Sequence, residues 1–192
     1  MTLRSGLSLS PIMGHQFDMD LQRAMRFYAL RLLKGRNWWG IPLRLIVGYG
    51  FLAHGYAKIV HGPDRFFAIL HTIGVPAAEF TGWLTILVEI FGGLAVLVGA
   101  FVPFASLPMA AVLLVAMFSV HLPYGFSSIK LISVTATGAQ FGQPGYEVDL
   151  LYLACLAALV IGGPGPLSVD CLIARQSRRD DPGESSHSTK IP

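Results

Sequence analysis

Six ionisable residues lie within or at the ends of long apolar stretches, and they are the residues best suited to chemistry. They are Arg44, His54, Lys58, Glu89, His121 and Glu147. Charged groups in apolar surroundings are costly, so they usually face one another or a cavity. A histidine beside a carboxylate can exchange a proton near neutral pH. The set predicts a ligand or proton site, or else ion pairs that only hold helices in register.

Spacing places three of these residues on one face of a helix predicted over residues 41–60. His54 and Lys58 are four residues apart and are therefore neighbours on the helix surface. Arg44 lies within about 80° of both around the axis, so this basic face must turn inward. Glu89, near the middle of the next apolar stretch, is the natural acidic partner.

By depth, His54 is the nearest basic neighbour of Glu89, at roughly 10 Å against roughly 15 Å below the outer surface. The long side chains of Arg44 and Lys58 also reach that level, so the sequence leaves the pairing open. The residues that we expect to converge in the outer half of the helices are His54, Lys58, Glu89, His121 and Glu147.

The elements that must position these residues are membrane helices. Of the 192 residues, 53% are hydrophobic and 13% are charged, whereas soluble domains carry roughly 25% charged residues. A chain of this length cannot hide so much apolar surface in one soluble core. The net charge of +3 is concentrated at the two ends, which argues against a nucleic-acid groove.

Residues 80–101 and 103–122 each have the length and apolarity of a membrane span and are joined by a short turn. The stretch 41–60 contains three basic residues and the stretch 147–163 is shorter, but both become spans in a chain that already crosses the bilayer. We therefore predict an all-α, polytopic membrane protein whose four-transmembrane-helix bundle occupies residues 41–172.

Basic residues set the predicted orientation. Lys and Arg gather before the first span and after the fourth, whereas the connections 61–79 and 123–147 hold only Arg65 and Lys130. Cytoplasmic flanks collect such residues, and an even number of spans puts both termini on one side. We expect both termini to be cytoplasmic.

Three segments flank or connect the spans. Residues 1–40 form a basic extension in which 21–34 has the spacing of an amphipathic interfacial helix. Residues 63–74 are too short to span but too apolar for a free loop, so we expect a short helix at the outer interface. Residues 173–192 are expected to be a disordered cytoplasmic tail, because the last sixteen of them cannot bury a core.

At this point the sequence resembles a known family. The string LRLIVGYGFLAHGYAKI is similar to the first-helix signature of the DoxX family of small membrane proteins. Further motifs follow in the family's order: Gly74-Val75-Pro76, Glu89-Ile-Phe-Gly-Gly, Gly99, His121 with Gly125-Phe126, Gly145-Tyr146-Glu147, and the segment from Gly163 to Asp170. The match covers about residues 41–172, and the N-terminal extension and a longer third connection, 123–146, depart from the pattern.

The resemblance implies a four-helix protein of the bacterial or archaeal inner membrane. The family is named for a subunit associated with quinone-linked sulfur oxidation, and relatives are linked to quinone or thiol stress and to membrane redox complexes. The leading hypothesis is a subunit or accessory of such a redox system, an oxidoreductase component by resemblance only. The competing hypothesis is a non-enzymatic small-solute transporter or assembly anchor whose ionic residues are structural.

No motif for a bound redox cofactor is found in the sequence. It has no GxGxxG after a strand, no CxxC and no dense cluster of His and Cys with ligand spacing, so we expect no metal site. His54 and His121 are weighed as axial haem ligands, but satisfied or interfacial histidines are the favoured interpretation. If electrons pass through this protein, we expect a diffusible quinone or a redox partner subunit to carry them.

Overall fold

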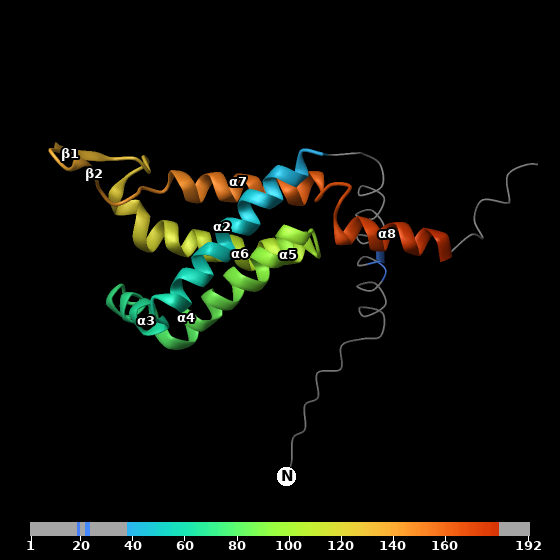
Figure 1. The fold of residues 1–192 in the computed structure, drawn as a ribbon. Helices are drawn as coiled ribbons and strands as arrows, with labels where there is room; N and C mark the ends of the chain where they lie inside the picture. The colour runs from blue at the N-terminus through green and yellow to red at the C-terminus, as the bar shows by residue number, and fades with distance from the viewer. Residues whose placement is uncertain (1–18, 20–21, 24–37, 181–192) are drawn as a thin grey trace, which may run out of the picture.

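The computed structural model describes residues 19, 22–23 and 38–180 (Figure 1). The interfacial helix expected over residues 21–34 lies almost entirely outside these described residues, as do residues 181–192 of the expected tail. The helices of the described part are α2 (Gly40–Val60), α3 (Pro63–Thr72), α4 (Ala78–Leu87), α5 (Gly93–Val98), α6 (Val102–Ala116), α7 (Glu147–Gly162) and α8 (Val169–Asp180).

Two of the long helices contain a π-helical turn, in which one extra residue is inserted into the α-helical ladder. The turn η1 (Val88–Gly92) joins α4 to α5, and η2 (Met117–His121) continues α6 into the short 3-10 turn η3 (Leu122–Tyr124). The resulting helices Ala78–Val98 and Val102–Tyr124 are long and apolar enough to cross a membrane.

These two apolar helices form the expected helical hairpin. Gly99 and Phe101 in the turn between them have φ angles of 71° and 49°. Helices also occupy the expected positions 41–60 and 147–163, as α2 and α7. That α2 and α7 cross the bilayer stays a prediction.

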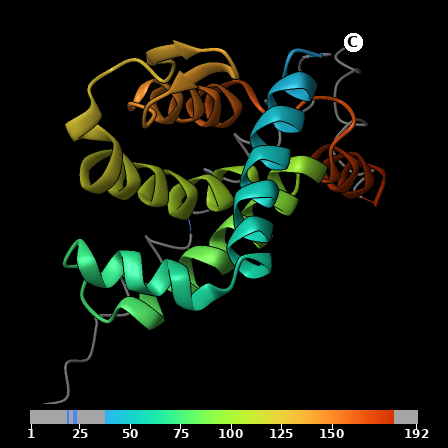
Figure 2. The same cartoon turned by 60° about the vertical axis from the view of Figure 1, so that its left-hand side comes forward.

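Helix α2 crosses the molecule diagonally and packs on α5, η1 and α7, while α6 packs on α7 and η1 (Figures 1 and 2). The core lies between them and consists of Val47, Phe51, Val96, Val102, Met109, Leu156 and Leu159. Gly48 and Gly93 bring two backbones together: a β-carbon on Gly48 would lie 2.8 Å from the carbonyl oxygen of Gly93. Small residues that allow such close approach are the usual packing device of helices in lipid.

The two ends of the helices differ. At one end, which we call the α3 end, α3 and α4 lie on one side and the β1–β2 hairpin on the other (Figures 1 and 2). At the opposite end, the α8 end, the chain leaves α7 and enters α8 close to the start of α2 (Figure 1).

The all-α prediction is corrected by a small sheet in the third connection. Strands β1 (Leu131–Thr135) and β2 (Gly138–Phe141) pair antiparallel through a two-residue turn. The segment LISVT is rich in β-branched residues, and no element was predicted for it within the third connection. The described protein is thus mostly helical rather than purely helical.

A second correction concerns the tail expected to be disordered from residue 173. Helix α8 continues through Asp180, so the first part of that segment is helical. Ser168 caps the helix, because its hydroxyl oxygen accepts the N–H of Cys171 at 3.1 Å. The same hydroxyl donates to the carbonyl of Gly165 at 2.8 Å. This cap gives α8 a defined start that composition alone did not predict.

Candidate functional site

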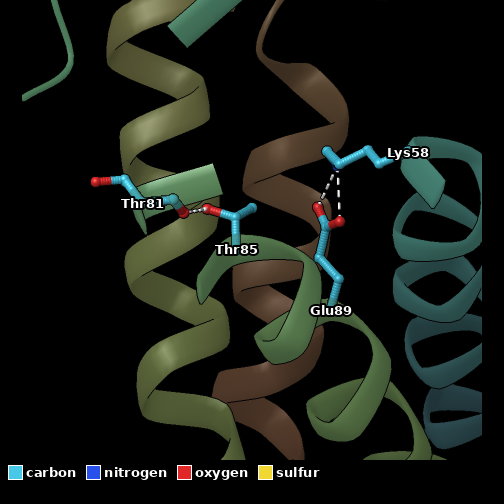
Figure 3. Close-up of polar contacts among 4 residues, drawn as sticks. All are labelled: Lys58, Thr81, Thr85 and Glu89. Atoms are coloured by element: carbon cyan, nitrogen blue, oxygen red, sulfur yellow. Dashed lines mark hydrogen bonds and ion pairs between the residues drawn. The ribbon is translucent and has the colours of Figure 1, made fainter. Parts of the chain in front are cut away.

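The first polar centre is an ion pair between Lys58 of α2 and Glu89 of η1 (Figure 3). The Lys58 Nζ lies 2.6 Å from Oε1 and 2.7 Å from Oε2 of Glu89. The two side chains are 20% and 7% exposed, so this pair is largely shielded by protein. The ammonium also lies 4.9 Å from the ring centroid of Phe66 in α3, within cation–π range. The question left open by the sequence is answered: the partner of Glu89 is Lys58, not His54 or Arg44.

Local structure explains why Glu89 meets α2. The π turn puts Glu89 on the side of the helix that faces Gly55, and a β-carbon on Gly55 would lie 3.1 Å from the Glu89 β-carbon. Glycine at this position therefore lets α2 approach η1 closely. One turn before Glu89, the hydroxyl of Thr85 donates to the carbonyl of Thr81 at 2.8 Å and is satisfied within its own helix (Figure 3).

The second polar centre joins His121 of η2 to Asp149 of α7. The His121 Nδ1 lies 2.5 Å from the Asp149 Oδ2, and the side chains are 28% and 7% exposed. Asp149 was missed by the sequence analysis, which took Glu147 as the acidic residue at the start of this helix. The available signal was a second carboxylate in the first turn of an otherwise apolar helix.

Both buried carboxylates lie toward the α3 end of their helices. Gly50 of α2 lies against the hydroxyl end of Tyr152 of α7. Gly55 marks the level of Glu89 and lies about 7.5 Å further along α2, at ~1.5 Å per residue. Asp149 lies about 4.5 Å from Tyr152 in the same direction, toward the α3 end. Both ion pairs therefore belong to the half of the molecule at the α3 end.

The remaining predicted site residues at this end are not part of either pair. His54 is exposed on α2. Glu147 Oε2 accepts the backbone N–H of Ser128 at 3.0 Å, and its own backbone N–H bonds to the carbonyl of Phe126. Glu147 thus joins the segment at Phe126 and Ser128, early in the third connection, to the start of α7. The expected five-residue cluster is replaced by two pairs, each with its own partners.

Arg44 lies apart from both pairs, at the α8 end. Its Nη2 donates to the carbonyl of Leu167 at 2.8 Å, and the residue is 4% exposed. Beside it, the Asp170 carboxylate accepts the backbone N–H of Phe101 at 2.8 Å, and the Asp170 N–H bonds to the carbonyl of Gly99 at 3.1 Å. We call this group the C-terminal clamp, because it ties α2, the α5–α6 turn and the start of α8 together.

The chemistry available at the α3 end is proton exchange and hydrogen bonding. Lys58 uses two of its three N–H groups on Glu89, which leaves one donor for a further acceptor. His121 uses one ring nitrogen on Asp149, which leaves Nε2 for another partner. Within the part of the chain that the structure describes, no group of three His, Cys, Asp or Glu residues has the geometry of a metal site.

The apolar helical hairpin and the ion pairs beside it define a membrane protein with polar groups enclosed among its helices. Residues 41–122 match the family model DoxX. The chain is also 32% identical, over 146 residues, to the uncharacterized membrane protein Rv3486 of Mycobacterium tuberculosis, covering 71% of this chain and 82% of that protein. This protein therefore belongs to the DoxX family, as the sequence motifs predicted. No solved structure matches the chain.

The family match includes Lys58, Glu89 and His121 but ends before Asp149. The Lys58–Glu89 pair thus lies entirely within the matched region, whereas the second pair joins that region to α7.

Proposed function

We propose that this protein is a multi-pass subunit or accessory of a quinone-linked or stress-related redox system in the bacterial or archaeal inner membrane. The observation that carries the proposal is that each ion pair has one member on a π-helical turn, Glu89 on η1 and His121 on η2. Such turns are rare and occur frequently at functional sites. Two of them, each presenting an ionisable residue to a partner, favour a site over a simple helix contact.

The proposed topology has four spans, with both termini in the cytoplasm and the α3 end facing outward. Helix α2 has 21 residues and is therefore about 31 Å long, which matches the hydrocarbon thickness of a bilayer. Helix α7 has 16 residues, and the ordered turns at both of its ends extend its reach. The excess of Lys and Arg on the segments before α2 and after α7 supports the orientation.

In this proposal the headgroup of a diffusible quinone binds beside the Lys58–Glu89 pair. The third N–H of Lys58 would donate to a quinone carbonyl, and Glu89 would hold the ammonium in place. The Phe66 ring, 4.9 Å from Nζ, provides an apolar face on which a planar headgroup can pack. A quinone dissolved in the bilayer would enter from the side, between helices, without leaving the apolar phase.

Electrons are assigned to a redox partner subunit. The side chains of the two pairs exchange protons and donate hydrogen bonds, but they do not carry electrons. The role proposed for this chain is therefore to bind the quinone and to manage its protons while the partner supplies or accepts electrons.

The alternative function is a transporter or assembly anchor whose ion pairs are structural. The contact of Lys58 with both oxygens of Glu89 favours this alternative, because a fully satisfied pair can fix the register of α2 against η1 without binding anything. The two functions differ in whether a quinone accompanies the protein.

Purification in mild detergent followed by lipid extraction separates them. We expect the parent protein to retain a quinone, and Glu89→Gln to lose most of it while keeping its elution volume and helix content. Glu79→Gln, which changes an exposed carboxylate on α4, is the matched control and should retain the quinone. A parent protein purified from quinone-containing membranes without any quinone would refute the redox function and favour the anchor.

A further inference from the structure

Helix α8 begins level with the end of the two apolar helices. The Asp170 N–H bonds to the carbonyl of Gly99 at 3.1 Å, and the Asp170 carboxylate accepts the N–H of Phe101 at 2.8 Å. Gly99 and Phe101 lie in the turn between the helices Ala78–Val98 and Val102–Tyr124. In a bilayer that these helices cross, the first turn of α8 therefore lies at the boundary between the acyl chains and the headgroups, at the α8 end of the molecule (Figure 1).

Apolar side chains are exposed at this boundary. Leu167, Leu172 and Ile173 are 65%, 60% and 49% exposed. The opposite face of α8 is packed against the protein, because Asp170 and Cys171 are both buried. The hydrogen bonds of Asp170 hold α8 by that packed face, so Leu172 and Ile173 stay turned outward. Apolar residues at this level gain free energy when they are covered by the acyl chains next to the headgroups.

Basic residues follow the apolar ones along the same helix. Arg175 is exposed, and Arg178 and Arg179 are one turn further along the sequence of α8. Positions 172, 175 and 179 have the spacing i, i+3 and i+7 and so share one face of the helix. Arg175 is five residues from Asp170, a rise of at most about 7.5 Å. A headgroup layer is roughly 5 to 8 Å thick, so Arg175 is within reach of the headgroups at any tilt of α8.

We propose that the start of α8 is a binding surface for anionic phospholipids, with its exposed apolar residues against the acyl chains and its three arginines paired with the headgroup phosphates. The charges are complementary. Of the two acidic residues of α8, Asp170 is buried and bonded to backbone, and Asp180 is at the last position. Guanidinium groups bind phosphate in a bidentate manner and are attracted to an anionic leaflet. Trp38 and Trp39, just before α2, are also exposed at this end, and indoles prefer the headgroup level. The proposal does not depend on the redox function, because it concerns the opposite end of the molecule from the ion pairs.

The test measures hydrogen–deuterium exchange of the α8 amides in the full chain, reconstituted in lipid nanodiscs of two compositions. One contains phosphatidylcholine alone, and the other contains phosphatidylcholine mixed with the anionic phosphatidylglycerol. Lipid that binds the ordered helix reduces its opening by mass action, so we expect exchange in α8 to be about tenfold slower with phosphatidylglycerol. Salt at about 1 M should remove most of this difference, because the Debye length falls to about 3 Å.

Variants of the three arginines show whether their charge is responsible. Arg175→Gln, Arg178→Gln and Arg179→Gln together should reduce the effect of phosphatidylglycerol to less than about twofold, at unchanged helix content. Lysine at the same three positions keeps the charge and should keep most of the effect. Arg65→Gln, which removes an exposed arginine of α3 at the other end, is the matched control and should keep the parent difference.

Three results would overturn the proposal. Equal exchange of the parent α8 in the two lipids would mean that anionic headgroups do not bind there. An unchanged difference in the glutamine variant would mean that the arginines do not bind the lipid. Loss of the difference in the lysine variant would mean that positive charge is not what recognises it.

Discussion

Replacing Glu89 by leucine would leave the Lys58 ammonium without its acceptors in a largely buried position. Breaking a buried pair by removing one partner costs roughly 3 to 5 kcal/mol, because the remaining charge is uncompensated. The Lys58 side chain is 20% exposed and the Phe66 ring lies 4.9 Å from it, so water and the ring offset part of this cost. We therefore expect a loss of about 3 kcal/mol, at the lower end of that range.

The measurement is reversible unfolding by SDS in mixed micelles, followed by circular dichroism. Glu89→Gln keeps an acceptor for one Lys58 N–H and should cost about 1 kcal/mol. The double variant Lys58→Met with Glu89→Leu removes both charges and should recover most of the stability, because apolar replacement of a whole buried pair is often neutral.

The parent, Glu89→Leu, Lys58→Met and the double variant form a thermodynamic cycle whose coupling term reports on the pair itself. A coupling energy below about 0.5 kcal/mol, the usual limit of additivity, would mean that the two side chains are not paired in the membrane. Unchanged stability of Glu89→Leu alone would refute the argument directly.

The other predictions concern topology, the C-terminal clamp and His54. In a background without native cysteines, a cysteine at Ser127 should be labelled from outside intact cells and one at Ser185 should not; the reverse pattern would overturn the orientation. Gly99→Val should lower the free energy of unfolding by at least about 2 kcal/mol, because residue 99 has a positive φ and the valine side chain would collide with Arg44. Equal stability would contradict the clamp. His54→Asn should change the unfolding free energy by no more than about 0.5 kcal/mol, since His54 is exposed. A large loss would mean that His54 has a buried partner in the membrane.

The sequence was sufficient to predict the helices at 41–60, 80–101, 103–122 and 147–163, because each is a long apolar run that ends at a glycine, a proline or a charge. It was also sufficient to find Glu89 as an acidic residue that needs a basic partner. These features depend on composition along the chain, which is read directly. The contacts between chain segments were harder to predict, and the errors have identifiable causes.

The π turns limit what helical spacing in the sequence can predict. Each turn inserts one residue, which rotates everything after it by about 100° relative to a regular α-helix. A helical wheel that assumes a regular α-helix through η1 or η2 therefore assigns the residues after the turn to the wrong face of the helix. Depth alone could not decide which residue pairs with Glu89, because the Lys58 side chain extends back one turn, past Gly55, to reach it.

Asp149 and the β1–β2 hairpin were missed because each long segment of the sequence was given a single structural assignment. The segment from 147 onward was treated as a short apolar span, so a second carboxylate in its first turn drew no attention. No element was predicted within the third connection, although LISVT carries the β-branched residues of a strand. In both places the signal was present in a few residues and was averaged out over a longer window.

Buried polar groups in this protein fall into two kinds, and the difference bears on function. At the α8 end, Arg44 and Asp170 bond to backbone groups, the carbonyl of Leu167 and the N–H of Phe101. Contacts of this kind tie one segment of the chain to the backbone of another. At the α3 end, Lys58 and Asp149 each bond to another ionisable side chain, and each of those partners lies on a π turn. In pairs of the second kind both members are acid–base groups, which is why we place the chemistry at the α3 end and the structural support at the other.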